Sequence, residues 1–118
     1  MDCYCDYEAP SVWRSSRPHA RKLYRCEECS AAIHVGDEHE YVFGVWGGRA
    51  DSVRTCARCV DLRQWVKNNI PCTCWSHGNL IDDLKASIEA ACERAPDEMR
   101  GVRFGFLRRL LPIKRRAA

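Results

Sequence analysis

The sequence predicts a small α+β domain, and three observations support this fold class. Two C-x-x-C pairs, at 26–29 and 56–59, enclose an insert of 26 residues. The insert contains the aromatic and β-branched stretch HEYVFGVW followed by Gly47 and Gly48, which predicts a β-hairpin with a tight turn. Apolar residues at helical spacing follow the second pair and recur beyond residue 79, which predicts two helices.

The two C-x-x-C pairs predict a metal site. A chain of 118 residues has a limited hydrophobic core, so we expect something besides burial to hold it. Paired cysteines at this spacing are typical of zinc, because each pair curls around one ion while the insert folds back. The predicted ligands are Cys26, Cys29, Cys56 and Cys59. Four thiolates leave no position for water or substrate, so we predict a structural site; buried or free thiols are the alternative.

The predicted helices follow the second pair. The first runs from about residue 60 to 69 with one apolar face, and Pro71 ends it. Cys59 then lies at its N-terminus, where the helix dipole favours a thiolate. The second is predicted by a repeat of every four residues, and Asn79 can cap its first turn. The repeat consists of Leu80, Leu84, Ile88 and Cys92, and we interpret Cys92 as a core residue.

Two C-x-C pairs predict a second, weaker zinc site. They are Cys3 with Cys5, and Cys72 with Cys74. Both thiols of a pair can face one ion, and the two pairs would then join the N-terminus to the loop after the first helix. Either His77 or His19 could replace one thiol, since imidazole also suits zinc. The alternative is that these cysteines are reduced surface thiols or redox-active.

The order of knuckle, hairpin, knuckle and helix over 26–69 resembles the treble-clef zinc fingers, including the second half of LIM-type modules. Several stretches between residues 2 and 84 also resemble a group of small, functionally uncharacterised zinc-binding proteins encoded by bacteriophages and prophages. They are MDCYCDYEAP, ARKLYRCEECSAAIHVGDEHEYVFGVWGG, TCARCVDLR and CTCWSHGNLIDDL. This resemblance implies the same four ligand pairs and assigns no activity.

Charge divides the chain into a predicted zinc-binding domain at 1–96 and a basic amphipathic tail at 97–118. All 16 acidic residues lie between Asp2 and Glu98 with 12 basic ones, whereas 100–118 holds seven basic residues and no acid. Gly101 and Gly105 weaken a helix before Phe106, and we expect the apolar stretch to stop at Pro112. The tail could dock on the body, fold on a partner, or contact nucleic acid or anionic lipid, and we favour the first two.

The sequence leads to three hypotheses about function. No secretory signal and no apolar run long enough to span a bilayer are present, so we expect a cytoplasmic protein. No catalytic motif is recognisable, so the leading hypothesis is a non-enzymatic protein. The resemblance to phage proteins implies that it binds and modulates a host protein, such as a defence, transcription or motility component. We expect the contact at Trp46, Arg108 and Arg109, because Trp and Arg dominate interface energetics.

The two alternatives depend on other residues. Five basic residues lie among aromatic ones at 13–25, which suits nucleic-acid binding by this stretch and the tail, although we favour a charged, solvated edge strand as the explanation. His34 and His39 suggest a further hypothesis, a divergent nuclease of the His-Asn-His type, a family that also has a treble clef. The predicted helix offers no histidine for that metal site, so exposed loop histidines are the simpler interpretation.

Overall fold

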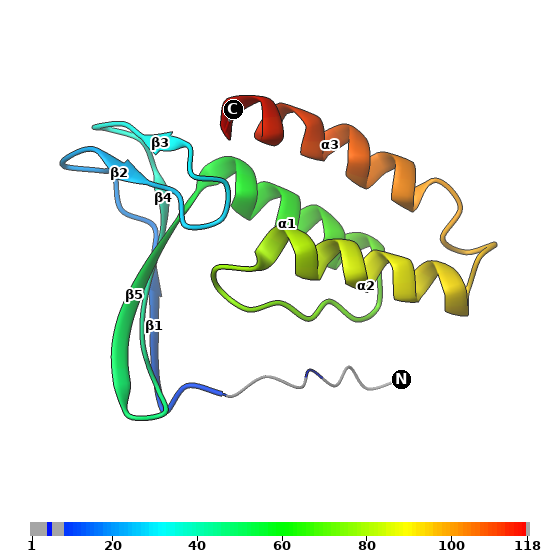
Figure 1. Ribbon diagram of the computed structural model, residues 1–118, viewed down its shortest axis with the longest axis horizontal. Coiled ribbons are helices and arrows are strands. Elements are labelled where there is room, and N and C mark those ends of the chain that lie inside the picture. Colours follow the sequence, from blue (N-terminus) through cyan, green and yellow to red (C-terminus); the bar gives the residue numbers. More distant parts are fainter. Residues whose placement is uncertain (1–4, 6–8, 118) are drawn as a thin grey trace.

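The computed structural model describes residue 5 and residues 9–117, and it is a small α+β domain, as predicted (Figure 1). Two antiparallel sheets precede three helices. The strands are β1 Val12–Ser16, β2 Tyr24–Arg25, β3 Ala32–Ile33, β4 His39–Trp46 and β5 Arg49–Cys56. The helices are α1 Ala57–Asn69, α2 Leu80–Arg94 and α3 Val102–Ala117. Within the described residues, no helix has the length and apolar character needed to cross a membrane.

The predicted hairpin is confirmed as β4 and β5, the centre and one edge of a sheet with the order β1-β4-β5. Its turn consists of Gly47 and Gly48, both at positive φ (56° and 79°), which L side chains rarely adopt. Side chains alternate along β4, so that Val42 is fully buried towards α1 while Phe43 is half-buried on the opposite face. The sheet therefore has an inner face against the helices and an outer face.

The strands before β4 differ partly from expectation. All five residues of β1 are exposed on an edge strand, which confirms the edge-strand interpretation for 12–16. The sequence predicts no strand between Cys29 and the hairpin, but Ala32 and Ile33 pair with β2 to form a second, two-stranded sheet. Burial accounts for the difference, because Ile33 is 1% exposed and belongs to the main hydrophobic core.

Helices α1 and α2 are confirmed close to their predicted bounds. The first helix begins at Ala57, three residues earlier than predicted, with Cys56 as its N-cap residue. It ends at Asn69, before Pro71. Asn79 occupies the N-cap position of α2, but its side chain makes no capping hydrogen bond. Cys92 is only half-buried and packs against the core, while Ala91 beside it is fully buried.

The C-terminal segment contradicts the expected stop at Pro112, since α3 continues through it to residue 117. A proline inside a helix costs about 3 kcal/mol. Phe106, Leu110 and Ile113 are buried against α1 and α2, and each contributes about 1.5–3 kcal/mol on burial, which outweighs that cost. Docking on the body is thus the arrangement shown for this segment. The boundary between 96 and 97 stays a prediction.

Candidate metal centre

The structure brings the four predicted zinc ligands together in one buried group. Cys26 and Cys29 lie in the turn between β2 and β3, Cys56 is the last residue of β5, and Cys59 is in the first turn of α1. Each is at most 6% exposed, and their four sulfur atoms lie within 4.8 Å of one another. They share one core with the apolar residues of all three helices, so the cysteine group is part of the interior.

The sulfur geometry fits a tetrahedral zinc ion. A Zn–S bond of about 2.3 Å gives sulfur–sulfur separations of about 3.8 Å at the edges of a tetrahedron. The separations are 3.9 Å between Cys26 and Cys59 and 3.7 Å between Cys29 and Cys56, far longer than a disulfide bond. The backbone N–H groups of Glu28 and Cys56 donate to Cys26 Sγ at 3.4 and 3.3 Å. These hydrogen bonds stabilise a thiolate, the form that binds metal.

The electrostatics of the group also favour a bound cation. Burial raises the pKa of the Cys29 thiol to about 11. Hydrogen bonding with Cys26 and Cys56, together with burial, raises the pKa of Cys59 as well. Hydrogen bonds with Cys26 and Cys59 lower the pKa of Cys56 instead, so the group does not ionise uniformly. A divalent cation supplies the charge that makes all four thiolates stable together. The described residues thus contain one buried four-cysteine group that could hold an ion such as Zn²⁺.

Comparisons with protein families, curated proteins and solved structures find no match. The treble-clef assignment and the resemblance to phage-encoded proteins therefore stay predictions. The described residues form antiparallel sheets and three helices around the buried four-cysteine group.

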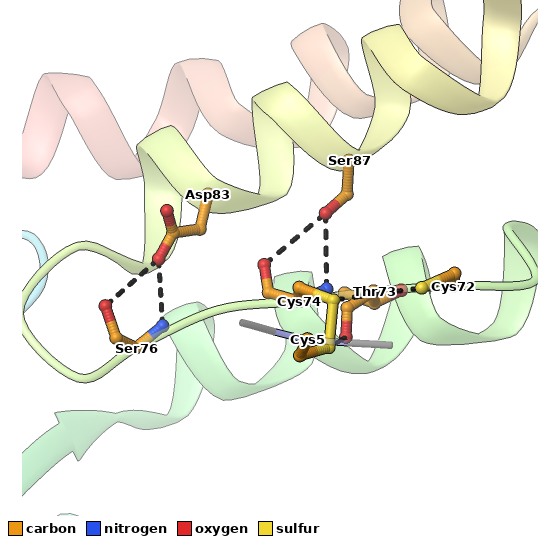
Figure 2. The surroundings of a disulfide bond; sticks show 7 residues. All are labelled: Cys5, Cys72, Thr73, Cys74, Ser76, Asp83 and Ser87. Carbon is orange, nitrogen blue, oxygen red and sulfur yellow. Dashed lines mark hydrogen bonds between the residues drawn. A yellow bond between two sulfur atoms is a disulfide. The ribbon is translucent and has the colours of Figure 1, made fainter. Parts of the chain in front are cut away.

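The second predicted zinc site differs from expectation, because Cys5 and Cys74 form a disulfide (Figure 2). The sulfur of Cys72 lies 3.8 Å from that of Cys74, and the three sulfurs lie within 4.8 Å of one another. Cys3 lies outside the described residues. Neither proposed histidine joins this group: His19 lies 4.0 Å from Glu38, and His77 packs against tryptophans.

Helix α2 holds the segment that carries this disulfide, as Figure 2 shows. Ser87 bonds to the backbone of Cys74, accepting from its N–H at 3.3 Å and donating to its carbonyl at 3.4 Å. The Asp83 carboxylate accepts from the N–H and the hydroxyl of Ser76 at 2.8 and 3.2 Å. These four bonds fix the path of residues 74–76, which include Trp75 and lead into His77.

Glu28, inside the first C-x-x-C pair, connects the metal centre to α2. Its carboxylate accepts from the backbone N–H groups of Gly78 at 2.9 Å and Leu80 at 3.0 Å. The second of these is an unpaired N–H of the first helical turn, so Glu28 supplies the cap that Asn79 does not. Sequence reasoning missed this role because the partners are 52 positions apart.

A buried ion pair joins the sheet to α1. Glu40 of β4 and Arg63 of α1 form a bidentate pair, with Arg63 Nη1 donating to Oε1 at 3.0 Å and Nη2 donating to Oε2. Their side chains are 11% and 10% exposed. The guanidinium of Arg63 also lies 4.5 Å from the ring centre of Trp75, a cation–π contact. The pair therefore positions Trp75 as well as the helix.

The two histidines of the nuclease hypothesis have different surroundings. His34 is exposed, as expected for a loop histidine. The same expectation is wrong for His39, which is fully buried because Tyr24 and Arg54 cover it. Arg54 Nη1 donates to its Nε2 at 2.7 Å, so the proton is on Nδ1, which lies 3.2 Å from the Asp37 carbonyl. Both ring nitrogens are thus engaged, and no base is presented to solvent there.

The three predicted partner-binding residues lie on two separate surfaces. Trp46 lines a groove of about 940 Å³ on the inner side of the sheet, together with Trp13, Trp75 and His77. Arg108 and Arg109 are exposed on α3 and are not among the residues that line this groove. Sequence reasoning missed the groove because its tryptophans are far apart in the chain.

Proposed function

We propose that the protein is a non-enzymatic binding module that zinc holds together and that takes a segment of a partner protein in the groove at Trp46. One observation carries this proposal: three of the four tryptophans converge with His77 on a single groove of about 940 Å³. The four-cysteine group provides no vacant ligand position once a tetrahedral ion is bound, which favours a structural role for the metal.

The groove has the composition of a protein-binding site. Tryptophan is the residue most often found at energetically dominant positions of interfaces. Trp13 is 55% exposed and available for contact. Glu27, Arg49 and Asp51 also line the groove and provide a polar rim. Trp46 and Trp75 are held by contacts with His77 and Arg63, so they lose less side-chain entropy on binding than freely rotating side chains would.

Two contacts hold Trp46 in place. Its indole lies across Gly44, so closely that a Cβ at position 44 would be 2.3 Å from the ring atom Cη2. Its other neighbour is His77, with the ring centres 6.4 Å apart in an edge-on arrangement. The His77 ring in turn lies 4.7 Å from that of Trp75. Glycine at position 44 is therefore needed for this close approach of ring to backbone.

The identity of the partner rests on the resemblance to phage-encoded zinc proteins, which favours a bacterial host protein that the chain inhibits. In this proposal Arg108 and Arg109 form a second contact region. Arg109 is already ordered, since its guanidinium lies 4.4 Å from the ring centre of Trp65 and its Nη1 donates to the Gly105 carbonyl at 3.1 Å.

The test is an affinity capture from bacterial lysate with the tagged, zinc-loaded chain, with and without nuclease and at two salt concentrations. We expect a stoichiometric host protein that survives nuclease and the higher salt. Trp46→Ala should weaken its binding by about 30-fold, the effect of a hot-spot residue. The matched control is Leu23→Ala, which removes an exposed apolar side chain outside the groove and outside α3, and should bind normally.

The same experiment contains the results that would contradict the proposal. Capture of the same protein by wild type and Trp46→Ala in equal amounts would exclude the groove as its site. Recovery of nucleic acid and its usual companions alone, lost at higher salt, would exclude protein binding altogether.

A further inference from the structure

The outer face of the sheet points away from all three helices (Figure 1). We define it by the strand register, because residues directly opposite each other have side chains on the same face. Its accessible part consists of Val12, Arg14 and Ser16 in β1, Tyr41, Phe43 and Val45 in β4, and Ala50, Ser52 and Arg54 in β5. The same register continues to His39 and Cys56, which are buried. The contact between Arg54 and the Tyr41 ring, at 4.5 Å, confirms that opposite residues share this face.

The charge of the outer face is of one sign. Its two charged residues, Arg14 and Arg54, are both basic. Lys22 adds a third positive charge at the border, where its Nζ lies 5.4 Å from the Tyr24 ring centre. Acidic side chains of the sheet, such as Glu40 and Asp51, have the opposite register and point to the inner side. A surface of this kind attracts a polyanion.

Aromatic rings occupy the centre of the same face. Tyr41 and Phe43 are half-buried, so part of each ring is accessible. They are two residues apart in one strand, which separates them by about 6.8 Å along β4. The Arg54 guanidinium already covers one side of the Tyr41 ring, at 4.5 Å, so Phe43 is the ring on which a flat group can stack. Bases of a single strand stack on aromatic side chains in this way without depending on sequence.

Arg54 is already held in a position suited to binding. Its guanidinium lies between two rings, 3.8 Å from the centre of Tyr24 and 4.5 Å from that of Tyr41. One N–H is donated to the buried His39. A guanidinium has five N–H donors, so others are available to phosphate oxygens. The arginine therefore loses little side-chain entropy on binding.

We infer that the outer face binds single-stranded nucleic acid, with a base stacked on Phe43 and phosphates at Arg14, Arg54 and Lys22. A duplex hides the flat faces of its bases, so it could use only the charges. An acidic peptide or an anionic membrane would likewise leave the Phe43 ring without a stacking partner. This binding site goes beyond the proposed function, because it lies on the opposite side of the sheet from the groove. Either site can be refuted without affecting the other.

The test is a fluorescence-anisotropy titration of the zinc-loaded chain with labelled 12-nucleotide DNA and RNA strands of mixed sequence, and with the matching duplexes. We expect either single strand to bind more tightly than its duplex. Three phosphate contacts on a single strand correspond to a log–log salt slope of about −2, or a loss of affinity of roughly 20-fold between 50 and 200 mM salt.

Two pairs of variants locate the site. Phe43→Leu keeps apolar packing but removes the ring, and should weaken single-strand binding by roughly 5- to 150-fold. Its control, Phe104→Leu, removes an exposed ring from α3 and should have no effect. Arg14→Gln should reduce the salt slope by about 0.7. Its control, Arg100→Gln, removes the same charge in the loop between α2 and α3, far from the sheet (Figure 1).

Each outcome supports the inference or overturns it. Binding that Phe43→Leu and Arg14→Gln weaken while both controls preserve it would support the site. Equal affinity for single strand and duplex, or equal losses in variants and controls, would assign binding to general charge and overturn the site. Absence of binding at 50 mM salt, or competition by polyglutamate or anionic vesicles as strong as by oligonucleotide, would overturn it too. Zinc content and thermal melting of every variant verify that the fold is intact.

Discussion

Replacing Glu40 with glutamine should destabilise the protein by about 3–5 kcal/mol, because it leaves the charge of Arg63 buried without its counter-ion. Both side chains are about nine-tenths buried, at 11% and 10% exposure, so solvent screens their interaction weakly. The two parallel hydrogen bonds of the pair add geometric specificity to the charge attraction. The same range applies to Arg63→Met, which isolates the carboxylate of Glu40 and also removes the contact with Trp75.

This loss is large relative to the total. A chain of 118 residues has an expected unfolding free energy of about 6–18 kcal/mol. At about 4 °C per kcal/mol, a loss of 3–5 kcal/mol lowers the melting temperature by roughly 12–20 °C. Calorimetry and urea unfolding of the zinc-loaded protein can measure both quantities.

The double variant Glu40→Gln/Arg63→Met isolates the interaction between the two side chains from their separate contributions. Because it leaves no isolated charge, we expect it to be more stable than either single variant, so that the two changes are strongly non-additive. The exposed Glu89–Arg103 pair is the control, since it has the same bidentate form but lies at the surface, and Arg103→Gln should have a far smaller effect. Additive losses below about 1 kcal/mol for Glu40→Gln and Arg63→Met would refute the reasoning.

Three further predictions follow from the metal centre and the groove. With the Cys5–Cys74 disulfide intact, native mass spectrometry should find one zinc per chain and none after Cys59→Ser; two per chain would mean that the second cysteine group also holds metal. Gly44→Ala should cost about 1–3 kcal/mol and shift the fluorescence of Trp46, because the new Cβ overlaps the ring; an unchanged spectrum would contradict this packing. Burial lowers the pKa of His77, so its contribution to stability is present above about pH 6.5 and is lost as the pH falls. The stability advantage of wild type over His77→Gln, from urea unfolding at pH 7.5 and 5.5, should therefore shrink on acidification, and a constant difference would be evidence against it.

Local patterns predicted much of this fold because their physical cause is local. The C-x-x-C spacing brings two thiols to one ion within a few residues, and the structure groups all four cysteines accordingly. Two glycines specify a tight turn, and the hairpin forms around them. Apolar residues at helical spacing specify which side of α1 and α2 is buried.

The remaining features depend on partners that are distant in sequence. His39 looks like a loop histidine until β2 and β5 bring Tyr24 and Arg54 over it. Glu28 looks like a spacer between two cysteines until α2 presents its N-terminus. Pro112 ends a helix on local grounds, but the core provides more energy than the proline removes. In each case a tertiary contact outweighs a local preference that was correctly recognised.

The connection between β5 and α1 joins the two proposed binding surfaces to the metal. Cys56 is at once the last residue of β5, the N-cap of α1 and a member of the cysteine group. The register of β4 against β5 places Trp46 on the inner side and Phe43 on the outer face, so both surfaces depend on strands that end at the metal centre. Loss of zinc should therefore weaken both binding activities together, whereas Trp46→Ala and Phe43→Leu should each weaken only one. A protein that lost one activity on chelation and kept the other would require a different account of how the metal centre supports the sheet.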